Sequence, residues 1–210
     1  MIKLYTGPTN NGKRASVLLE EMGVEYEAEE ILTKGNHRTP DYQALNPIGK
    51  IPTIVDPDGP GGEPYTLYET TAIAFYLSDK SGRFQPRDAR EKAEILKWCS
   101  IVVSGFNSIF GLLFSIQRHK WDVPQVREHY LGEAHRYLKV MDDQLAKTAY
   151  LAGEDYTIAD MMAYPEIATV AQMQIEDLAK YENIARWREA VAARDAVERG
   201  MAVPKMDWGR

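Results

Sequence analysis

Short apolar segments alternate with helical patterns along the N-terminal part of the chain. Residues 2–5 and 26–31 are predicted strands. Between them, the apolar positions of residues 15–22 recur at the spacing of an amphipathic helix, which stops at Gly23. Two strands joined by a helix make a βαβ unit, so we expect these two strands to be parallel.

Two further strands are predicted at residues 51–55 and 65–68. The segment between them, residues 56–62 (DPDGPGG), is dense in turn-forming residues and predicts an antiparallel hairpin. A helix over residues 70–79 follows and ends near Gly82. The order β-α-β, a loop, then β-β-α is the thioredoxin-like arrangement.

Beyond a polar linker at residues 83–87, strand signals vanish and helical periodicity takes over. The main helices are predicted at residues 90–114, 126–147, 158–172 and 184–193. Thr157 and Asp160 fit a capping box, in which each side chain accepts from the other residue's amide. The predicted fold class is therefore α/β plus all-α. A thioredoxin-like domain occupies residues 1–82, and an all-helical domain occupies residues 88–210.

Composition restricts the classes of function. The chain has 210 residues with 25 Lys and Arg against 31 Asp and Glu, a net charge of −6, and basic and acidic residues are mixed throughout. This balance argues against a nucleic-acid partner, because phosphate binding needs clustered basic residues. The N-terminus lacks a long apolar segment, and we expect no apolar run to reach the length that spans a bilayer, so we expect a cytoplasmic protein without a membrane partner.

The cysteine content bears on redox chemistry. Cys99 is the single cysteine, which excludes an intramolecular disulfide and a paired redox motif. Cys99 is next to Trp98 in a predicted helix and is expected to be a buried apolar residue. Any thiol chemistry must then use a sulfur that a ligand brings. No His, Cys or carboxylate group has the spacing of metal ligands, so no metal is expected.

Three motifs together resemble the cytosolic glutathione transferase family over nearly the whole chain. They are residues 46–54 (NPIGKIPTI), 68–73 (YETTAI) and 151–160 (LAGEDYTIAD). Within that family, residues 5–13 (YTGPTNNGK) and 35–40 (GNHRTP) resemble the bacterial nu-class enzymes and the related yeast nitrogen-regulator protein. Those relatives place a Thr-x-Asn pair at the first helix.

The resemblance implies where glutathione binds. Pro52 would follow a cis peptide bond, which leaves the amide and carbonyl of Ile51 facing the cysteinyl backbone of glutathione. The alternative is that Pro52 merely begins an edge strand. Thr70 would bind the γ-glutamyl carboxylate at a positive helix end and Glu69 the ammonium group, although both could simply cap a helix. His37 and Lys50 are the cations available for the glycyl carboxylate.

The reactive sulfur would be that of glutathione, held as a thiolate. A thiol with a pKa of ~8.5 is mostly protonated at neutral pH. The Asn11 amide, the Thr9 hydroxyl and backbone N–H groups near Gly12 are donors that prefer the anion, so Asn11 and Thr9 are the predicted catalytic residues. Tyr5 is the rival donor, because other classes of the family use a tyrosine near the end of the first strand.

The helical domain would supply the pocket for the second substrate. Phe106, Asn107 and Phe110 lie along one predicted helix, and a plain bundle core is the alternative explanation for the two rings. His129 stands where many nu-class relatives have an arginine that reaches glutathione.

The resemblance implies a glutathione-dependent enzyme, expected to be a homodimer. We expect it to reduce disulfides by thiol–disulfide exchange, to conjugate glutathione to electrophiles, or both. Glutathione would act as co-substrate beside a small disulfide or an electrophile. The alternative is a noncatalytic interaction module with the same fold. The complete set of motifs argues against that alternative.

Overall fold

The computed structural model describes residues 1–33, 35–173, 175 and 177–204. The chain divides into two compact units. Unit 1 comprises Met1–Gln85 together with the segment that begins at Ala193, and unit 2 comprises Pro86–Ala192. The fold of unit 1 is thioredoxin-like and that of unit 2 is all-helical, as predicted.

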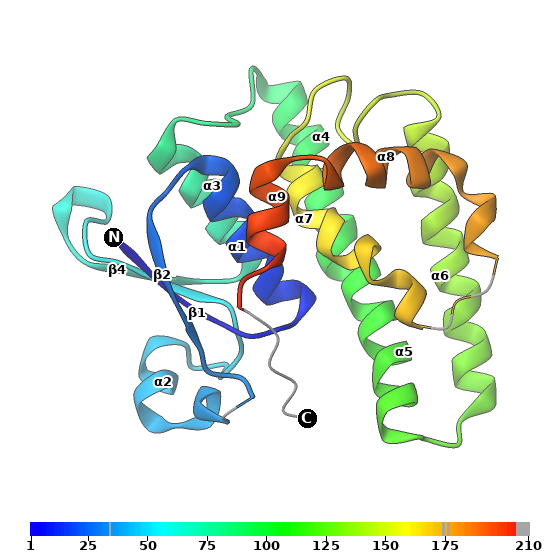
Figure 1. Cartoon of the computed structure of the whole chain (residues 1–210), viewed down its shortest axis with the longest axis horizontal. Coiled ribbons are helices and arrows are strands. Elements are labelled where there is room, and N and C mark those ends of the chain that lie inside the picture. Colours follow the sequence, from blue (N-terminus) through cyan, green and yellow to red (C-terminus); the bar gives the residue numbers. More distant parts are fainter. Residues whose placement is uncertain (34, 174, 176, 205–210) are drawn as a thin grey trace. The chain divides into compact units, whose positions relative to one another are not determined.

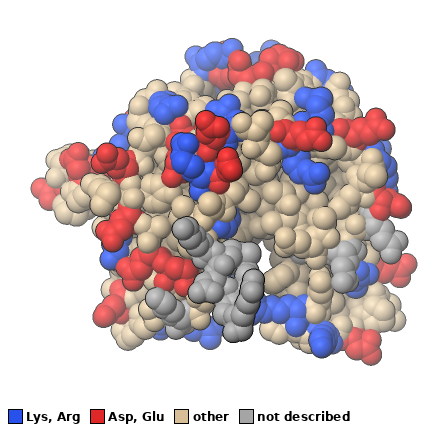
Figure 2. Space-filling model, in the orientation of Figure 1, with Lys and Arg blue, Asp and Glu red and all other residues tan. Residues whose placement is uncertain are grey.

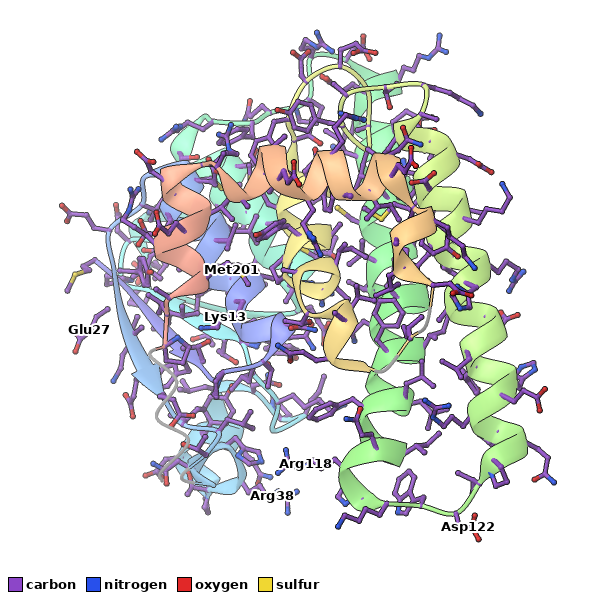
Figure 3. The ribbon with its side chains drawn as sticks, turned by 45° about the vertical axis from the view of Figure 1, so that its right-hand side comes forward. Lys13, Glu27, Arg38, Arg118, Asp122 and Met201 are labelled. Carbon is purple, nitrogen blue, oxygen red and sulfur yellow. The ribbon has the colours of Figure 1, made fainter. Side chains whose placement is uncertain are left out.

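Four strands of the described residues in unit 1 form one sheet in the order β2-β1-β3-β4 (Figure 1). β1 (Ile2–Thr6) and β2 (Tyr26–Glu30) pair in parallel, which confirms the predicted βαβ unit around α1 (Asn10–Met22). β3 (Thr53–Asp56) is antiparallel to β1 and to β4 (Tyr65–Tyr68), so the hairpin is also confirmed. β2 is an acidic edge strand, and Glu27 on it is labelled in Figure 3.

Helices cover both faces of this sheet. α1 and α3 (Thr70–Ser81) lie on one face, where the core forms, and α2 (Pro40–Leu45) lies on the other (Figure 1). β1 shows the alternation that such a sheet requires, because Ile2, Leu4 and Thr6 are buried and the residues between them are half-buried. Fully buried aliphatic side chains fill the core face: Leu4, Val17, Leu18, Ile54, Ile73 and Leu77.

Three differences from the predicted elements of unit 1 have local causes. α1 begins at Asn10, before the apolar pattern starts, because the Thr9 side chain caps it. The predicted loop before β3 contains η1 (Asn36–Arg38) and α2, which begins with the Thr39 cap and Pro40. β3 begins only at Thr53, because the cis Ile51–Pro52 bond precedes it.

The last helix, α9 (Asp195–Met201), belongs to unit 1, whereas the predicted helical domain ran to residue 210. α9 packs closely on α1, since a Cβ atom on Gly200 would lie 2.5 Å from the Cα atom of Val17. Figure 3 labels Lys13 on α1 and Met201 on α9, and polar contacts join the two segments. Ser16 Oγ donates to the Gly200 carbonyl at 2.7 Å, and Lys13 Nζ donates to the Pro204 carbonyl at 3.0 Å.

Unit 2 is a bundle built from one long helical run and the helices that pack on it. Its described elements are α4 (Ala89–Ser100), a π-helical turn η3 (Ile101–Phe106), α5 (Asn107–His119), α6 (Pro124–Leu145), α7 (Ile158–Ala168), the short helices η4 (Val170–Met173) and η5 (Leu178–Lys180), and α8 (Glu182–Ala192). The predicted helix 90–114 is thus interrupted by η3. Gly105 lies there because a Cβ atom would come within 2.1 Å of the Tyr137 ring.

The run Ala89–His119 contains a stretch that is long and apolar enough, by length and composition alone, to cross a membrane. This corrects the expectation that no apolar run reaches that length. Trp98, Phe106 and Phe110 of this run lie in the core of unit 2 and are at most 2% exposed, whereas Phe114 is 41% exposed.

The start of α7 is the capping box that the sequence predicts. Thr157 accepts within the first turn, and the Thr157 amide donates to Asp160 Oδ2 at 2.9 Å. Asp160 is fully buried and also accepts from the Leu151 amide at 3.0 Å and the Trp187 indole at 2.8 Å. Burial raises the pKa of Asp160, and these donors oppose that effect.

Candidate functional site

The residues predicted to bind glutathione lie in three segments next to strands, and these segments meet at the same end of the sheet. Tyr5 on β1 lies opposite Thr53 on β3, and Thr53 lies opposite Tyr68 on β4. β3 runs against both neighbours, so the turn after β1, the residues before β3 and the residues after β4 meet at this end. Adjacent strands are about 4.8 Å apart, so the turn after β1 and the start of α3 are about 10 Å apart across the sheet.

The turn after β1 is held in place at Thr9. Thr9 Oγ1 accepts from the Gly12 amide at 3.3 Å, and its amide donates to the Gly7 carbonyl at 2.8 Å. Gly12 allows the backbone to pass this closely, because a Cβ atom there would lie 2.1 Å from the Gly7 carbonyl oxygen. Among the described residues, the Thr9 hydroxyl has no acceptor for its own proton, so it can donate to a ligand.

Asn11 is half-buried in the first turn of α1. Its carbonyl oxygen Oδ1 accepts a hydrogen bond from the guanidinium of Arg14. The side-chain NH₂ group is on the other branch of the amide and remains a donor.

Tyr5 lies on the other face of the sheet from the start of α1. Its ring packs against Tyr42 of α2 at a centroid distance of 5.7 Å, and the Lys3 ammonium lies 4.8 Å from the ring centroid. Thr6, the next residue, contacts the α1 side, since its hydroxyl is close to Gly12. Because side chains alternate along a strand, this geometry favours Asn11 and Thr9 over Tyr5 as the donors.

The residue before β3 has the backbone that the resemblance implies. The Ile51–Pro52 bond is cis, and neither the amide nor the carbonyl of Ile51 has a hydrogen-bond partner among the described residues. The preceding carbonyl, that of Lys50, accepts from Tyr42 Oη at 2.6 Å and from Asn46 Nδ2 at 2.8 Å. The loop is therefore fixed on one side, while Ile51 presents an unpaired donor and acceptor on the other.

α3 begins without a side-chain cap. Glu69 precedes it with φ of +74°, a backbone conformation that is rare for a residue with a side chain. Its carboxylate is exposed and makes no capping bond, so the first amides of α3 stay open. Thr70 is buried, and the buried hydroxyl of Thr71 has no partner within the described chain. An open helix N-terminus of this kind suits a carboxylate.

The two predicted cations lie on neighbouring turns. His37 lies in η1, and its carbonyl oxygen is 3.2 Å from where a Cβ atom on Gly49 would stand, next to Lys50. His37 Nδ1 is buried and lacks a partner among the described residues, whereas the Lys50 side chain is exposed. Both residues can therefore offer a proton donor to an anionic group.

The residues predicted for the second-substrate pocket differ in exposure within unit 2. Phe106 and Phe110 are 1% and 0% exposed and pack on each other at a centroid distance of 5.4 Å. This burial favours the core alternative for both rings. Asn107 is half-buried, and His129 is exposed with its ring edge-on to Tyr130.

A separate hollow of about 550 Å³ lies in unit 2 and includes none of the predicted residues. Tyr181 Oη and His135 Nδ1 are 2.9 Å apart at its wall. Burial, and the nearby charge of Lys180, lower the pKa of His135. Asp142 on the same wall accepts from the Asn183 and Ile184 amides, so it caps α8. Within the described residues, no group of three or more His, Cys, Asp or Glu is placed to hold a metal ion.

Arg14 and Thr71 are polar residues of the site that sequence reasoning missed. Both lie inside helices, where a charged or hydroxyl side chain is ordinarily taken as solvated. Arg14 is fully buried instead. The signal was present in the helical spacing, since Arg14 follows Asn11 by one turn and shares the face that carries Val17 and Leu18.

A thioredoxin-like unit with a cis-proline loop, followed by an all-helical unit, is the glutathione transferase fold. The chain belongs to the glutathione S-transferase family. Residues 11–80 match the family's N-terminal domain, and residues 108–195 match its C-terminal domain. The chain is 34% identical to the disulfide-bond oxidoreductase YfcG of Escherichia coli, with 100% of this chain and 97% of YfcG aligned.

Solved structures of the family are similar in fold. A glutathione transferase family member from Pseudomonas fluorescens, with two glutathione molecules bound, is 33% identical with a TM-score of 0.90, covering 95% of this chain and 92% of that one. The transferase of Pseudomonas putida, with one glutathione disulfide bound per subunit, is 31% identical with a TM-score of 0.91, covering 97% and 91%.

Proposed function

We propose that this protein binds glutathione at the end of the unit 1 sheet, holds its sulfur as a thiolate and uses it to reduce disulfide bonds. The observation that carries the proposal is a set of open polar groups at this one end of the sheet. They are the start of α1, the backbone of Ile51, which is unpaired among the described residues, and the uncapped start of α3. Supporting it, YfcG is named a disulfide-bond oxidoreductase, and the Pseudomonas putida relative holds glutathione disulfide.

Each part of the tripeptide has a complementary group in this proposal. The amide and carbonyl of Ile51, beside Pro52, pair with the cysteinyl backbone as a short antiparallel strand does. The open amides of α3 and the Thr70 hydroxyl bind the γ-glutamyl carboxylate, and Glu69 binds the ammonium group. Lys50 and His37 bind the glycyl carboxylate.

The chemistry requires the thiol to ionise near neutral pH. Lowering a thiol pKa by about two units takes ~2.7 kcal/mol of preference for the anion. Hydrogen bonds from Asn11 Nδ2 and the Thr9 hydroxyl, at the positive end of α1, are together of that size. Neither group needs to accept the proton, which leaves to solvent.

The reduction then proceeds by two exchanges. The bound thiolate attacks one sulfur of the substrate disulfide, forming a mixed disulfide with glutathione and releasing the other sulfur as a thiolate. A second glutathione thiolate attacks the mixed disulfide, which yields glutathione disulfide and the second substrate thiol. Two glutathione molecules are oxidised for each disulfide reduced.

Conjugation is the second candidate reaction, because the same thiolate can attack an electrophilic carbon. In both reactions Asn107 and His129, the more exposed of the predicted pocket residues, are the ones we propose to approach the second substrate. Which of the two reactions takes place depends on the second substrate that these residues accept.

We also propose that the protein is a nu-class enzyme, a homodimer, and cytoplasmic. The exposed apolar side chains of Tyr65 on β4 and Leu96 on α4 support a dimer contact. Basic and acidic groups are interspersed on the face in Figure 2, which supports a partner other than nucleic acid. A cytoplasmic location follows from the need for reduced glutathione.

Turnover with a glutathione-linked mixed disulfide, compared with a halogenated aromatic acceptor, tests the reaction. We expect faster turnover of the disulfide; activity with the aromatic acceptor alone would contradict disulfide reduction. Calorimetric titration with reduced and oxidised glutathione tests the site. Glu69→Ala should weaken binding of both forms at least tenfold through loss of the ammonium contact. Failure of the wild type to bind either form would favour a noncatalytic module.

A further inference from the structure

Arg14 is a buried arginine in the helix that begins at the proposed thiolate site. Its side chain is fully buried in α1, and its guanidinium donates to Asn11 Oδ1. Burying a guanidinium is costly unless its hydrogen bonds are met, and a leucine or methionine would serve the helix and the core at lower cost. The cost suggests that the contact with Asn11 has a function.

The chemistry of the amide identifies that function. A side-chain amide has one branch that only accepts hydrogen bonds and one branch that only donates them. The Arg14 guanidinium donates to Asn11 Oδ1. If the Asn11 amide were flipped, its NH₂ group would face the guanidinium, and two hydrogen-bond donors would oppose each other. Arg14 therefore fixes which branch is turned away from it, and that branch is NH₂.

Resting on the proposed function, we propose that Arg14 is a positioning residue: it locks the Asn11 amide so that only a donor faces the sulfur of glutathione. A donor stabilises the thiolate, which only accepts, and gains little from the protonated thiol. An unlocked amide could instead turn its oxygen to the S–H group and stabilise the protonated form. Arg14 thus makes Asn11 selective for the ionised sulfur.

The alternative is that Arg14 is structural. Residues three apart on a helix often form side-chain pairs worth only ~0.2–0.5 kcal/mol. Arg14 also has a further interaction besides the bond to Asn11, so its removal changes more than one contact. The experiment must therefore isolate the part of its effect that depends on Asn11.

A double-mutant cycle on the pKa of the bound thiol does this. Wild type, Arg14→Met, Asn11→Ala and the double variant are titrated with glutathione bound, and the ultraviolet absorbance of the thiolate is followed with pH. We expect Arg14→Met to raise the thiol pKa by about one unit, the size of one lost hydrogen bond to an anion. In the Asn11→Ala background the same change should shift it by less than about 0.3 units.

Two further variants complete the test. Arg14→Lys keeps one donor and the charge, and should retain most of the wild-type thiol pKa. Arg194→Met removes the ion pair with Glu21 at the other end of α1, where the nitrogen and oxygen lie 2.6 Å apart, and controls for general weakening of the helix. It should leave the thiol pKa unchanged.

If Arg14→Met does not fold, Asn11→Asp keeps an oxygen for Arg14 and replaces the NH₂ group by an acceptor. It should raise the thiol pKa by more than one unit, and an unchanged or lowered value would overturn the proposal. Equal shifts from Arg14→Met with and without Asn11 would also overturn it, since Arg14 would then act through its charge or the fold. Other results would contradict the proposed function itself: the wild type would bind no glutathione, or Asn11→Ala would leave the pKa of the bound thiol unaltered.

Discussion

Among the described helices that begin at a threonine cap, α1 and α7 differ in what remains unpaired. At α7, Thr157 and Asp160 satisfy each other, and the same carboxylate also accepts from Leu151 and Trp187. At α1, Thr9 accepts a single bond from Gly12, and the Asn11 amide keeps its donors. The first cap is closed by the protein, and the second is open to a ligand.

The difference teaches how to separate a structural cap from a binding site. Both have the residue type that caps helices, so residue identity alone cannot distinguish them. The distinction lies in whether the donors of the first turn find partners within the protein, since buried polar groups are nearly always paired. A half-buried helix start with spare donors is therefore the one to test for a ligand.

Removing the acceptor of the closed cap should have the largest effect. Asp160→Ala would leave buried donors of Leu151, Thr157 and Trp187 unpaired, so we expect a loss of about 3 kcal/mol or more in the free energy of unfolding. Urea unfolding measures it. Asp155→Ala, a change in the loop before α7 at an exposed ion pair with Arg87, should cost less than about 1 kcal/mol. A loss below 1 kcal/mol for Asp160→Ala would contradict the closed-cap description.

Removing the side-chain donors of the open cap should change the ionisation of the bound thiol and the turnover of disulfides. Thr9→Ala combined with Asn11→Ala should raise the pKa of the bound thiol by about two units, back to ~8.5, and lower the thiolate fraction about 25-fold at pH 7. Spectroscopic titration and disulfide turnover measure both. Thr157→Ala is the matched change in the closed cap, and should cost about 1 kcal/mol of stability without altering the thiol. If the double variant behaved like Thr157→Ala, the open cap would have no part in catalysis.

Adding a methyl group at Gly12, in the turn that the open cap holds, should reduce the stability of the protein by an intermediate amount. Gly12→Ala places a Cβ atom against the Gly7 carbonyl and Thr6 Oγ1, which would lie 2.1 and 2.7 Å away, so we expect a loss of about 1–3 kcal/mol and displacement of Thr9. Gly111→Ala on α5 adds its methyl group in open space and should gain about 0.5–1 kcal/mol. Thermal unfolding of both variants compares them. Equal stabilities would mean that the turn relaxes freely.

The smallest expected effect is the pH dependence of folding stability that comes from His135, a residue outside both caps. The pKa of His135 is lowered, so the unfolded chain takes up a proton first as the pH falls. The stability that depends on neutral His135 is thus complete above the ordinary pKa of ~6.5 and declines below it. We expect a decline of less than about 1 kcal/mol between pH 7 and 5, absent in His135→Gln. Urea unfolding at each pH measures this change in the free energy of unfolding.

The sequence predicted the sheet, the hairpin and the closed cap because each depends on neighbours in the chain. Turn formers at residues 56–62 define the hairpin, and the spacing of Thr157 and Asp160 defines the cap. The cis bond before Pro52 was implied by family resemblance. What sequence could not supply were contacts between distant segments. The packing of α9 on α1 depends on the bare backbone of Gly200, and the burial of Phe106 and Phe110 depends on neighbours such as Tyr137.

Three of the residues predicted to bind glutathione lie next to strands. Thr9, Ile51 and Glu69 each flank a strand end, and the strand register brings those ends to one edge. The helical spacing places Arg14 one turn after Asn11, but it does not reveal that the guanidinium is buried and donates to the Asn11 oxygen, so the role proposed for Arg14 could not be predicted. These three flanking roles remain predictions until glutathione binding is measured.

The discontinuity of unit 1 has a consequence for how the protein is made. Ribosomes deliver the strands first and α9 last, and domains usually mature in that same order. Here Lys13 and Ser16 can donate hydrogen bonds to the carbonyl groups of Pro204 and Gly200 only after all of unit 2 has been synthesised. The helical unit can therefore mature during translation, while α1, where the predicted donors Thr9 and Asn11 lie, waits for the synthesis of α9.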